Sequence, residues 1–401
     1  MSDIPDLSLA QRRMFITTLA LFLSYLAVAM ALPVVPVYVT RDLGMSNAAG
    51  GLAVGIAFLS TILTRNVAGG VADRRGSRYA MLRGLMVYVA ACLLCLVSAL
   101  PDLHGALAYG LLLAGRLLLG LGESLVIVAT ISWGIGLMGP SRSGKVMALV
   151  GAAMYGAFAV GGPLGLALLH AGGFSGLMAM CAALPLLGAC LVRAVPEVEP
   201  HGGRRESFWR ILGGIWLPGA AVCLQGVGFA ALAAFISLYF LSRGWAHAGL
   251  GLSCFGGGFV AVRLFFGHLP DRIGGTPVAI VSLVIEAAGQ YLLWLAPGPV
   301  VALFGALLTG LGCSMVFPAM GSEVVKGMPP QLRGTAVGGF AAFQDLAYGA
   351  TGPATGLLAD HFGYGVVFLI GGIAATLGVS VAVMAHRQAA NRRPDAAGAE
   401  R

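Results

Sequence analysis

The chain has 401 residues, of which 58% are hydrophobic and 10% are charged, and its mean hydropathy is +0.89. A water-soluble domain of this size cannot bury so much apolar surface, so the composition excludes a soluble globular protein. The net charge of +8 does not indicate nucleic-acid binding, because the basic residues lie in short clusters between long apolar runs.

Twelve of these apolar runs are predicted to be transmembrane helices. In chain order they cover residues 14–39, 47–72, 79–100, 105–137, 144–170, 174–194, 212–241, 247–270, 276–296, 299–326, 333–359 and 364–386. A polar stretch from Val195 to Arg210 interrupts the series after the sixth run. We therefore expect an all-α integral membrane protein with two six-helix domains, residues 1–195 and 211–401, joined by a connector at 196–210.

The positions of the basic residues predict the orientation, because Lys and Arg concentrate in cytoplasmic loops. In a twelve-span arrangement the basic clusters on one side are Arg12, Arg13, Arg74, Arg75, Arg78, Arg142, Lys145, Arg204, Arg205, Arg210, Arg387, Arg392 and Arg393. The loops on the other side contain Arg41 and Arg243. We expect both termini to be cytoplasmic.

A charged cassette occurs twice, and the two copies are 198 residues apart. The copies consist of Arg65, Gly69, Asp73, Arg74 and Gly76, and of Arg263, Gly267, Asp271, Arg272 and Gly274. Two further pairs share an offset of 190 residues: Gly120 and Gly122 with Gly310 and Gly312, and Gly162-Pro163 with Gly352-Pro353. Duplicated halves of this kind are typical of secondary transporters.

These motifs resemble those of the major facilitator superfamily over nearly the whole chain. The loop signature of that family is matched by Gly69, Asp73, Arg74, Gly76 and, one position late, Arg78, and its helix 4 signature by Arg116, Gly120 and Gly122. The helix 5 signature is matched only in part, at Gly156, Gly162, Pro163 and Gly165, while Ala167 stands where glycine is usual. This departure weakens a specific antiporter assignment.

Four longer strings are similar to the YhhS/YfcJ-like branch of bacterial members of this superfamily. They are the runs at residues 61–65, 120–124, 225–229 and 342–345. The resemblance implies a bacterial inner membrane and a fold in which helices 1, 4, 7 and 10 line a central cavity.

The cassette residues are candidates for a gating latch at the cytoplasmic face. Gly69 and Gly267 would let helices approach closely there. Asp73 could accept backbone N–H groups at the start of helix 11, and Arg74 or Arg65 could pair with Asp73. Such a clasp would hold in an outward-facing state and break when the inside opens. The alternative is a simple turn that sets membrane orientation.

Helix 4 contains the leading candidates for proton coupling. Arg116 lies well within the span, and charges in the bilayer are usually functional or paired. Glu123 follows two turns later on the same face. We expect Glu123 to bind the proton and Arg116 to modulate it, with a static structural pair or direct substrate contact as alternatives.

Other polar residues near mid-span are further candidates. Asp345, next to Gln344, could be a second protonation or substrate site or have a structural role. For Glu286 we favour an interhelical hydrogen bond over transport chemistry, because helix 9 is peripheral in the resembled fold. The candidates for solute contact are Tyr25, Trp133, Tyr155, Gln225 and Gln344, although packing explains the aromatic residues equally well.

Several helix breakers favour kinks and rocking: Pro33, Pro36, Pro163, Pro318 and Pro353. The predicted function is proton-coupled efflux of a small organic solute such as a sugar or drug-like compound, with proton-coupled uptake as the alternative. A membrane enzyme or sensor is less favoured, because the sequence has no clustered catalytic set. We expect no cofactor, metal or nucleic acid, and a monomer whose partners are the solute, protons and membrane lipid.

Overall fold

The structure is a computed structural model that describes residues 7–139, 142–198, 208–328 and 333–398. Within these ranges the regular structure is helical. The first half contains α1 (Leu7–Ala31), α2 (Val35–Val37), the π-helix η1 (Tyr38–Asp42), α3 (Asn47–Arg75), α4 (Ser77–Val97), α5 (Gly105–Met138) and α6 (Ser143–Val192). The second half contains α7 (Phe208–Ser242), α8 (Leu250–Phe266), α9 (Leu269–Ile273), α10 (Gly275–Leu295), α11 (Pro299–Lys326), α12 (Arg333–Phe362) and α13 (Gly365–Gly398).

The twelve predicted spans are confirmed as helices, with three differences in continuity. The eighth span is divided into α8 and α9 by a turn at Gly267 and His268. The first span is divided into α1, α2 and η1, because Pro33 and Pro36 lack the N–H groups that an unbroken helix needs. The fifth and sixth spans form the single element α6, whose backbone breaks at Gly173 with φ of +64°. Since a positive φ costs glycine little, this residue lets the chain turn between two spans without a loop.

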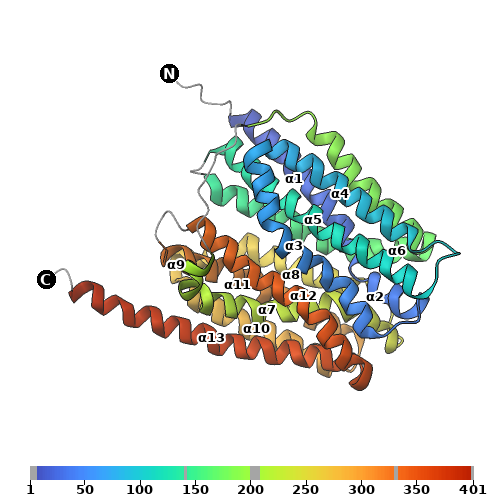
Figure 1. Cartoon of the computed structure of the whole chain (residues 1–401). Helices are drawn as coiled ribbons and strands as arrows, with labels where there is room; N and C mark the ends of the chain where they lie inside the picture. The colour runs from blue at the N-terminus through green and yellow to red at the C-terminus, as the bar shows by residue number, and fades with distance from the viewer. Residues whose placement is uncertain (1–6, 140–141, 199–207, 329–332, 399–401) are drawn as a thin grey trace.

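The helices form two bundles, α1 to α6 and α7 to α13 (Figure 1). Between the bundles, α3 packs on α12 and α6 packs on α8. Both chain termini lie at one end of the molecule, where the helices of the two bundles diverge in Figure 1. We call this the basic end, because it includes the α3–α4 turn with Arg74 and Arg75, and we call the other end, with Asn47 and Asp360, the opposite end.

The two bundles repeat each other in local geometry. The turn after α3 contains Gly76 with φ +89° and ψ 157°, and the corresponding turn before α10 contains Gly274 with φ +94° and ψ 153°. In the interior, Gly120 lies against the Ala57 carbonyl and Gly310 against the Phe255 carbonyl, at offsets of 190 and 198 residues. The cassette glycines and the helix 4 glycines are therefore equivalent positions of a duplicated fold.

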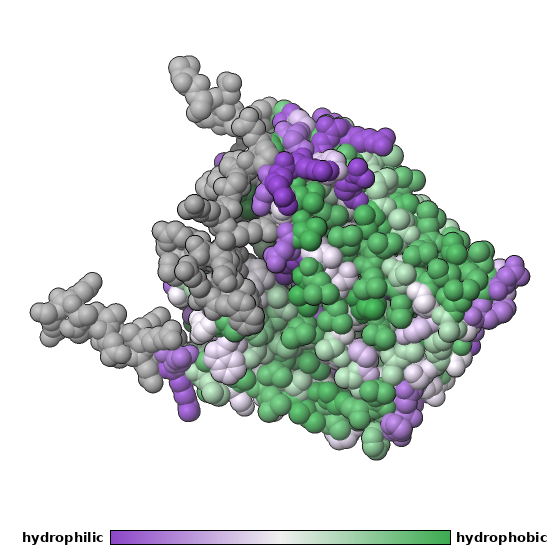
Figure 2. Space-filling model, viewed as in Figure 1, coloured by the Kyte–Doolittle hydropathy of each residue, from purple (hydrophilic) through white to green (hydrophobic). Residues whose placement is uncertain are grey.

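The outer surface suits a lipid environment. Figure 2 shows a broad hydrophobic band over the helices, with hydrophilic residues gathered toward its two ends. Large apolar side chains are exposed on this outer surface, among them Phe15, Leu63, Leu264, Phe265 and Leu358. Because water does not tolerate such a continuous apolar surface, the band marks the membrane-facing part of a multi-pass protein.

Candidate functional site

The α3–α12 seam is tightest toward the opposite end, where glycines from the two bundles touch. A Cβ at Gly51 would overlap the Gly352 carbonyl, and one at Gly55 would overlap the Gly349 carbonyl. A Cβ at Gly356 would lie 2.5 Å from the Asn47 carbonyl oxygen. Small residues four apart on facing helices let the backbones approach, so this seam has the packing typical of membrane helices.

The second seam, between α6 and α8, uses the same principle. A Cβ at Gly162 would lie 2.9 Å from the Gly249 carbonyl oxygen, and a Cβ at Gly256 would lie 2.5 Å from the Ala159 nitrogen. Pro163 and Pro353 lie inside α6 and α12 directly after the paired glycines. The predicted packing residues Gly162 and Gly352 thus contribute to contacts between the bundles.

Asp360 caps the start of α3 across the seam, and the sequence analysis did not identify this residue. Its Oδ1 accepts hydrogen bonds from the Asn47 backbone N at 2.9 Å and from Asn47 Nδ2 at 2.7 Å, and its Oδ2 accepts one from the Ala48 N at 3.3 Å. A carboxylate at a helix N-terminus satisfies free N–H groups and complements the helix dipole. The set Asn47, Ala48, Asp360 is referred to below as the Asp360 cap.

Tyr364 reinforces this cap from the loop between α12 and α13. Its hydroxyl donates to Asn47 Oδ1 at 2.8 Å. Burial raises the pKa of Tyr364, an effect that the hydrogen bond to Asn47 opposes only in part. The hydroxyl therefore stays protonated and able to donate at neutral pH.

Farther toward the basic end, an ion pair crosses the same seam. Arg65 of α3 pairs with Asp345 of α12, and the Arg65 side chain also lies 3.5 Å from the Gly338 carbonyl oxygen. The two side chains are 27% and 14% exposed, so water or the membrane interface still reaches them. In this conformation α3 turns Arg65 toward α12, and the predicted pairing of Arg65 with Asp73 stays a prediction.

Aromatic side chains from both bundles meet at the centre of the molecule. Tyr25, Tyr155 and Phe158 come from α1 and α6, and Phe229, Phe259 and Tyr348 come from α7, α8 and α12. The ring of Phe158 lies 5.4 Å from that of Phe229, and Tyr155 stacks on Phe259 at 3.5 Å. Tyr348 contacts Phe229 at 4.8 Å. These six residues are called the central aromatic cluster.

Glu123 lies beside this cluster and is bonded to one of its members. The Tyr25 hydroxyl donates to Glu123 Oε1 at 2.6 Å. The ring of Tyr25 lies edge-on to Phe158 at 6.3 Å. Tyr25 and Glu123 are only 2% and 5% exposed, so the expectation that they line a watery cavity is not met in this conformation.

Arg116 points away from Glu123 into the first bundle. Its Nε donates to the Ala53 carbonyl oxygen at 2.8 Å, while its Nη2 is buried without a hydrogen-bond partner among the described residues. A small void beside it is lined by Cys92, Cys95 and Cys181. The two charges share helix α5, as expected, but they form no direct ion pair within the described residues.

The amide candidates lie together, whereas Trp133 lies apart. Gln344 Nε2 donates to Gln225 Oε1 at 3.1 Å, which links α12 to α7 one residue from Asp345. The indole of Trp133 is fully buried and donates to the Pro196 carbonyl oxygen at 3.1 Å, near the end of the first bundle. Among the predicted solute contacts, Tyr25, Tyr155, Gln225 and Gln344 are thus central, and Trp133 has the alternative packing role.

Arg74 and Arg78 at the basic end make contacts within the first half of the chain. Arg74 Nε donates to the Gly70 carbonyl oxygen, and the Arg78 N and Nη2 donate to Glu197 and to the Arg193 carbonyl. Gly69 is buried as expected. Gly267 is exposed in this conformation, and the nearest atoms to a Cβ there belong to Arg263, so the predicted close helix approach at Gly267 is not formed here and stays a prediction.

The second cassette differs from the first in its partners. Arg263 donates to the Ser314 carbonyl oxygen and lies over the Phe259 ring at 5.2 Å. Asp271 and Arg272 lie exposed in α9. The predicted bond from Asp73 to the start of α12 stays a prediction, because residues 329–332 lie outside the described residues.

Comparison with known proteins identifies the fold and the family. The family model described as Major Facilitator Superfamily matches residues 17–274 and 219–400. The chain belongs to the major facilitator superfamily. An uncharacterised MFS-type transporter of Salmonella typhimurium is 42% identical over 375 residues, which is 94% of this chain and 97% of the relative.

Solved structures of other superfamily members have the same fold. The nucleoside transporter NupG aligns with a TM-score of 0.76 at 13% identity, covering 93% of this chain and 99% of NupG. A D-xylose–proton symporter also aligns with a TM-score of 0.76, at 17% identity, covering 92% and 96%. The protein is therefore a multi-pass MFS transporter, while its assignment to the YhhS/YfcJ-like branch stays a prediction.

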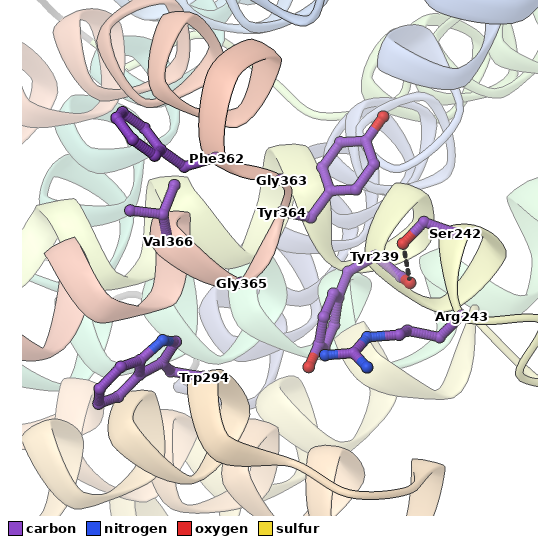
Figure 3. A pocket seen from close by; sticks show the side chains of 9 residues that line it. All are labelled: Tyr239, Ser242, Arg243, Trp294, Phe362, Gly363, Tyr364, Gly365 and Val366. Carbon is purple, nitrogen blue, oxygen red and sulfur yellow. Dashed lines mark hydrogen bonds between the residues drawn. The ribbon is translucent and has the colours of Figure 1, made fainter.

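This MFS transporter also has a cavity of about 640 Å³ at the opposite end of the second bundle. Figure 3 shows Tyr239 and Arg243 on one side of it and Trp294 and Phe362 on the other. The Arg243 guanidinium lies over the Tyr239 ring at 5.6 Å. None of the predicted solute or proton residues lines this cavity, so it is separate from the central site.

Proposed function

We propose that this MFS transporter is a proton-coupled antiporter that exports a small organic solute by alternating access. The observation that carries the proposal is the buried Tyr25–Glu123 hydrogen bond, at 2.6 Å, beside the central aromatic cluster that joins the bundles. A carboxyl group at a moving interface can be coupled to the conformational cycle, because its protonation changes the contacts that it can make.

The proposed orientation places the basic end in the cytoplasm of a bacterial cell, with both termini on that side of the inner membrane. In this orientation the Asp360 cap and the glycine seams close the periplasmic side. The conformation then corresponds to an inward-facing state. To face outward, α3 must leave α12 near Gly51 and Gly352, and the cassette around Asp73 must close the cytoplasmic side.

In this proposal, protonation changes which hydrogen bonds Glu123 can donate and accept. An ionised Glu123 accepts the hydroxyl of Tyr25, as the 2.6 Å distance describes. A protonated Glu123 has a donor of its own and depends less on Tyr25. Protonation therefore loosens the contact between α5 and α1 and changes how Tyr25 packs on Phe158.

The Arg65–Asp345 pair responds to the same movement from the second bundle. It joins α3 to α12, so it must break or rearrange when the seam opens. Gln344 lies next to Asp345 and binds Gln225. Aromatic faces and amide groups together suit a solute that has both an apolar surface and hydrogen-bonding groups.

The proposal is tested with the purified protein in vesicles that contain a pH-sensitive dye. Neutral sugars, nucleosides and lipophilic cations are added singly across an imposed pH gradient, and solute-dependent proton flux is recorded. We expect one class to drive flux in the wild type and Glu123→Gln to abolish it. Asp102→Asn, at an exposed loop position, is the matched control and should retain the flux.

Two results would count against the proposal. Normal solute-dependent proton flux in Glu123→Gln would remove Glu123 from the coupling mechanism. Proton movement in the same direction as the solute would replace export by antiport with uptake by symport, the alternative function.

A further inference from the structure

A second buried carboxyl group lies in the second bundle, outside the proposed proton site. Glu286, at the centre of α10, is completely buried, and neither of its carboxyl oxygens has a hydrogen-bond partner among the described residues. The Cys313 thiol of α11 lies beside it and is the nearest candidate donor. The predicted interhelical hydrogen bond of Glu286 therefore has a weak candidate partner on α11 and stays a prediction.

Glu286 occupies the position in the second bundle that Tyr88 occupies in the first. A Cβ at Gly122 would lie 3.2 Å from the Tyr88 N and 3.1 Å from the Gly84 carbonyl oxygen. A Cβ at Gly312 would meet the Glu286 N and, at 2.6 Å, the Ser282 carbonyl oxygen. The α4–α5 crossing and the α10–α11 crossing therefore correspond at these positions, since Gly84 matches Ser282 and Tyr88 matches Glu286 at an offset of 198 residues.

The same correspondence makes Cys313 the equivalent of Glu123. Glu123 follows Gly122 on α5 and lies near Tyr88 of α4, and Cys313 follows Gly312 on α11 and lies near Glu286 of α10. Each bundle thus has one carboxyl group at the same helix crossing, on α5 in the first bundle and on α10 in the second. The carboxyl group therefore lies at the same crossing in both bundles, although a different helix of the pair supplies it.

Glu123 and Glu286 differ in the hydrogen-bond donors that surround their carboxyl groups. Glu123 receives the Tyr25 hydroxyl. Around Glu286, α7 presents the backbone of Gly228, α11 presents the Cys313 thiol, and α10 itself presents Gln290. Gln290 directs its Nε2 to the Gly228 carbonyl oxygen at 3.1 Å, and α13 faces Gln290 with Gly371.

Among the described residues, an ionised carboxylate in this place would have no cation beside it and, as a side-chain donor, only the weak Cys313 thiol. Charges in the membrane interior persist only when they are paired or hydrated. A protonated carboxyl group carries no charge and supplies its own donor. The burial of Glu286 without partners is thus accounted for by a bound proton.

A polar path leads from Glu286 to the seam between the bundles. Cys313 lies between Glu286 and Gln225, Gln225 accepts the hydrogen bond from Gln344, and Asp345 follows Gln344 in α12. The Arg65–Asp345 pair at the end of this path is partly exposed. When α12 moves relative to α7, water can enter between the two amide side chains.

We propose that Glu286 is a second proton-binding site of this transporter, loaded in the described conformation and emptied when the Gln225–Gln344 contact opens. On opening, the carboxylic acid gives its proton to the entering water and becomes a hydrated carboxylate. This inference goes beyond the proposed function, which assigns the coupling proton to Glu123.

Infrared spectroscopy of the protein in lipid vesicles tests the first part of the proposal without any solute. We expect the wild type at neutral pH to show the carbonyl stretch of a protonated carboxylic acid. Glu286→Gln, which has the shape of the neutral acid, should lose this band, and Glu123→Gln should keep it. A wild-type spectrum without the band, or a Glu286→Gln spectrum identical to the wild type, would overturn the proposal.

A second variant guards against misfolding of Glu286→Gln. Cys313→Ser places a stronger hydrogen-bonding group beside the acid, so the band should shift in frequency while it remains present. An unshifted band would mean that the signal comes from another carboxyl group, and the assignment to Glu286 would fall.

The release step is tested by exchange in deuterated water. The substitutions Asn47→Cys and Asp360→Cys allow a cross-link that holds the opposite end closed. We expect the Glu286 band to exchange much more slowly in the cross-linked protein than after the link is cleaved. Equal rates would refute release during the cycle. These measurements do not depend on a transported solute, so failure of the export proposal would leave their outcome interpretable.

Discussion

Substitution of Gly51 by alanine should shift the transporter away from the described conformation. On α3, Gly51 and Gly55 face Gly352 and Gly349 of α12. A Cβ at Gly51 would overlap the Gly352 carbonyl and lie 2.9 Å from the Pro353 nitrogen. Ordinary van der Waals contact needs about 3.5 Å, so the two helices must separate by about 1 Å near this point.

The energetic cost falls on one state only. Overpacking of a close interface costs about 1–3 kcal/mol. The state in which α3 and α12 separate at the opposite end does not contain this contact and escapes the cost. The population ratio of the two states should therefore change by about 5- to 150-fold toward opening of the opposite end.

Distances between spin labels at residues 102 and 298 measure this shift, because both positions lie in loops at the opposite end, one in each bundle. The Gly51→Ala protein should gain a population with a longer distance. Gly257→Ala is the matched control, since a Cβ at this helical glycine meets no atom within 4 Å. If Gly51→Ala had the same distance distribution as Gly257→Ala, the seam would not control the conformation.

Three further predictions follow from individual contacts. Asp360→Ala removes the cap from α3, so it should weaken closure of the opposite end by about 0.5–2 kcal/mol, and the same spin-label pair should report more of the long distance. Arg65→Gln and Asp345→Asn should each lower the unfolding temperature in detergent, because a single change leaves a half-buried charge unpaired. The double variant should lower it by less than the sum of the two single effects. Strict additivity would mean that the pair contributes no coupling. Trp133→Phe loses the hydrogen bond to Pro196, so it should lower the free energy of unfolding by about 1 kcal/mol and retain solute exchange. Lost exchange with normal stability would mean that Trp133 belongs to the solute site.

Much of the candidate site could be predicted from the sequence, because charged residues are rare inside transmembrane spans. Glu123, Arg116 and Asp345 are charged residues inside apolar runs, which is a strong signal in a membrane protein. Asp360 gave no such signal, because a single acid near the end of a span is ordinary. Its role depends on the start of α3, which lies more than 300 residues earlier in the chain.

Hydropathy and repetition in the sequence determined the membrane class, the twelve spans and the duplicated halves, because each depends on local composition or on a fixed offset along the chain. The matching positive φ values at Gly76 and Gly274 follow from the same repeat. The partners of the polar side chains were decided only by the tertiary structure. Arg65 meets Asp345, Trp133 meets Pro196, and Glu286 lies buried among described residues that offer it no cation, because of the rotation of each helix about its axis and the placement of one bundle against the other. These two quantities arise from packing over the whole molecule, and no short stretch of sequence contains them.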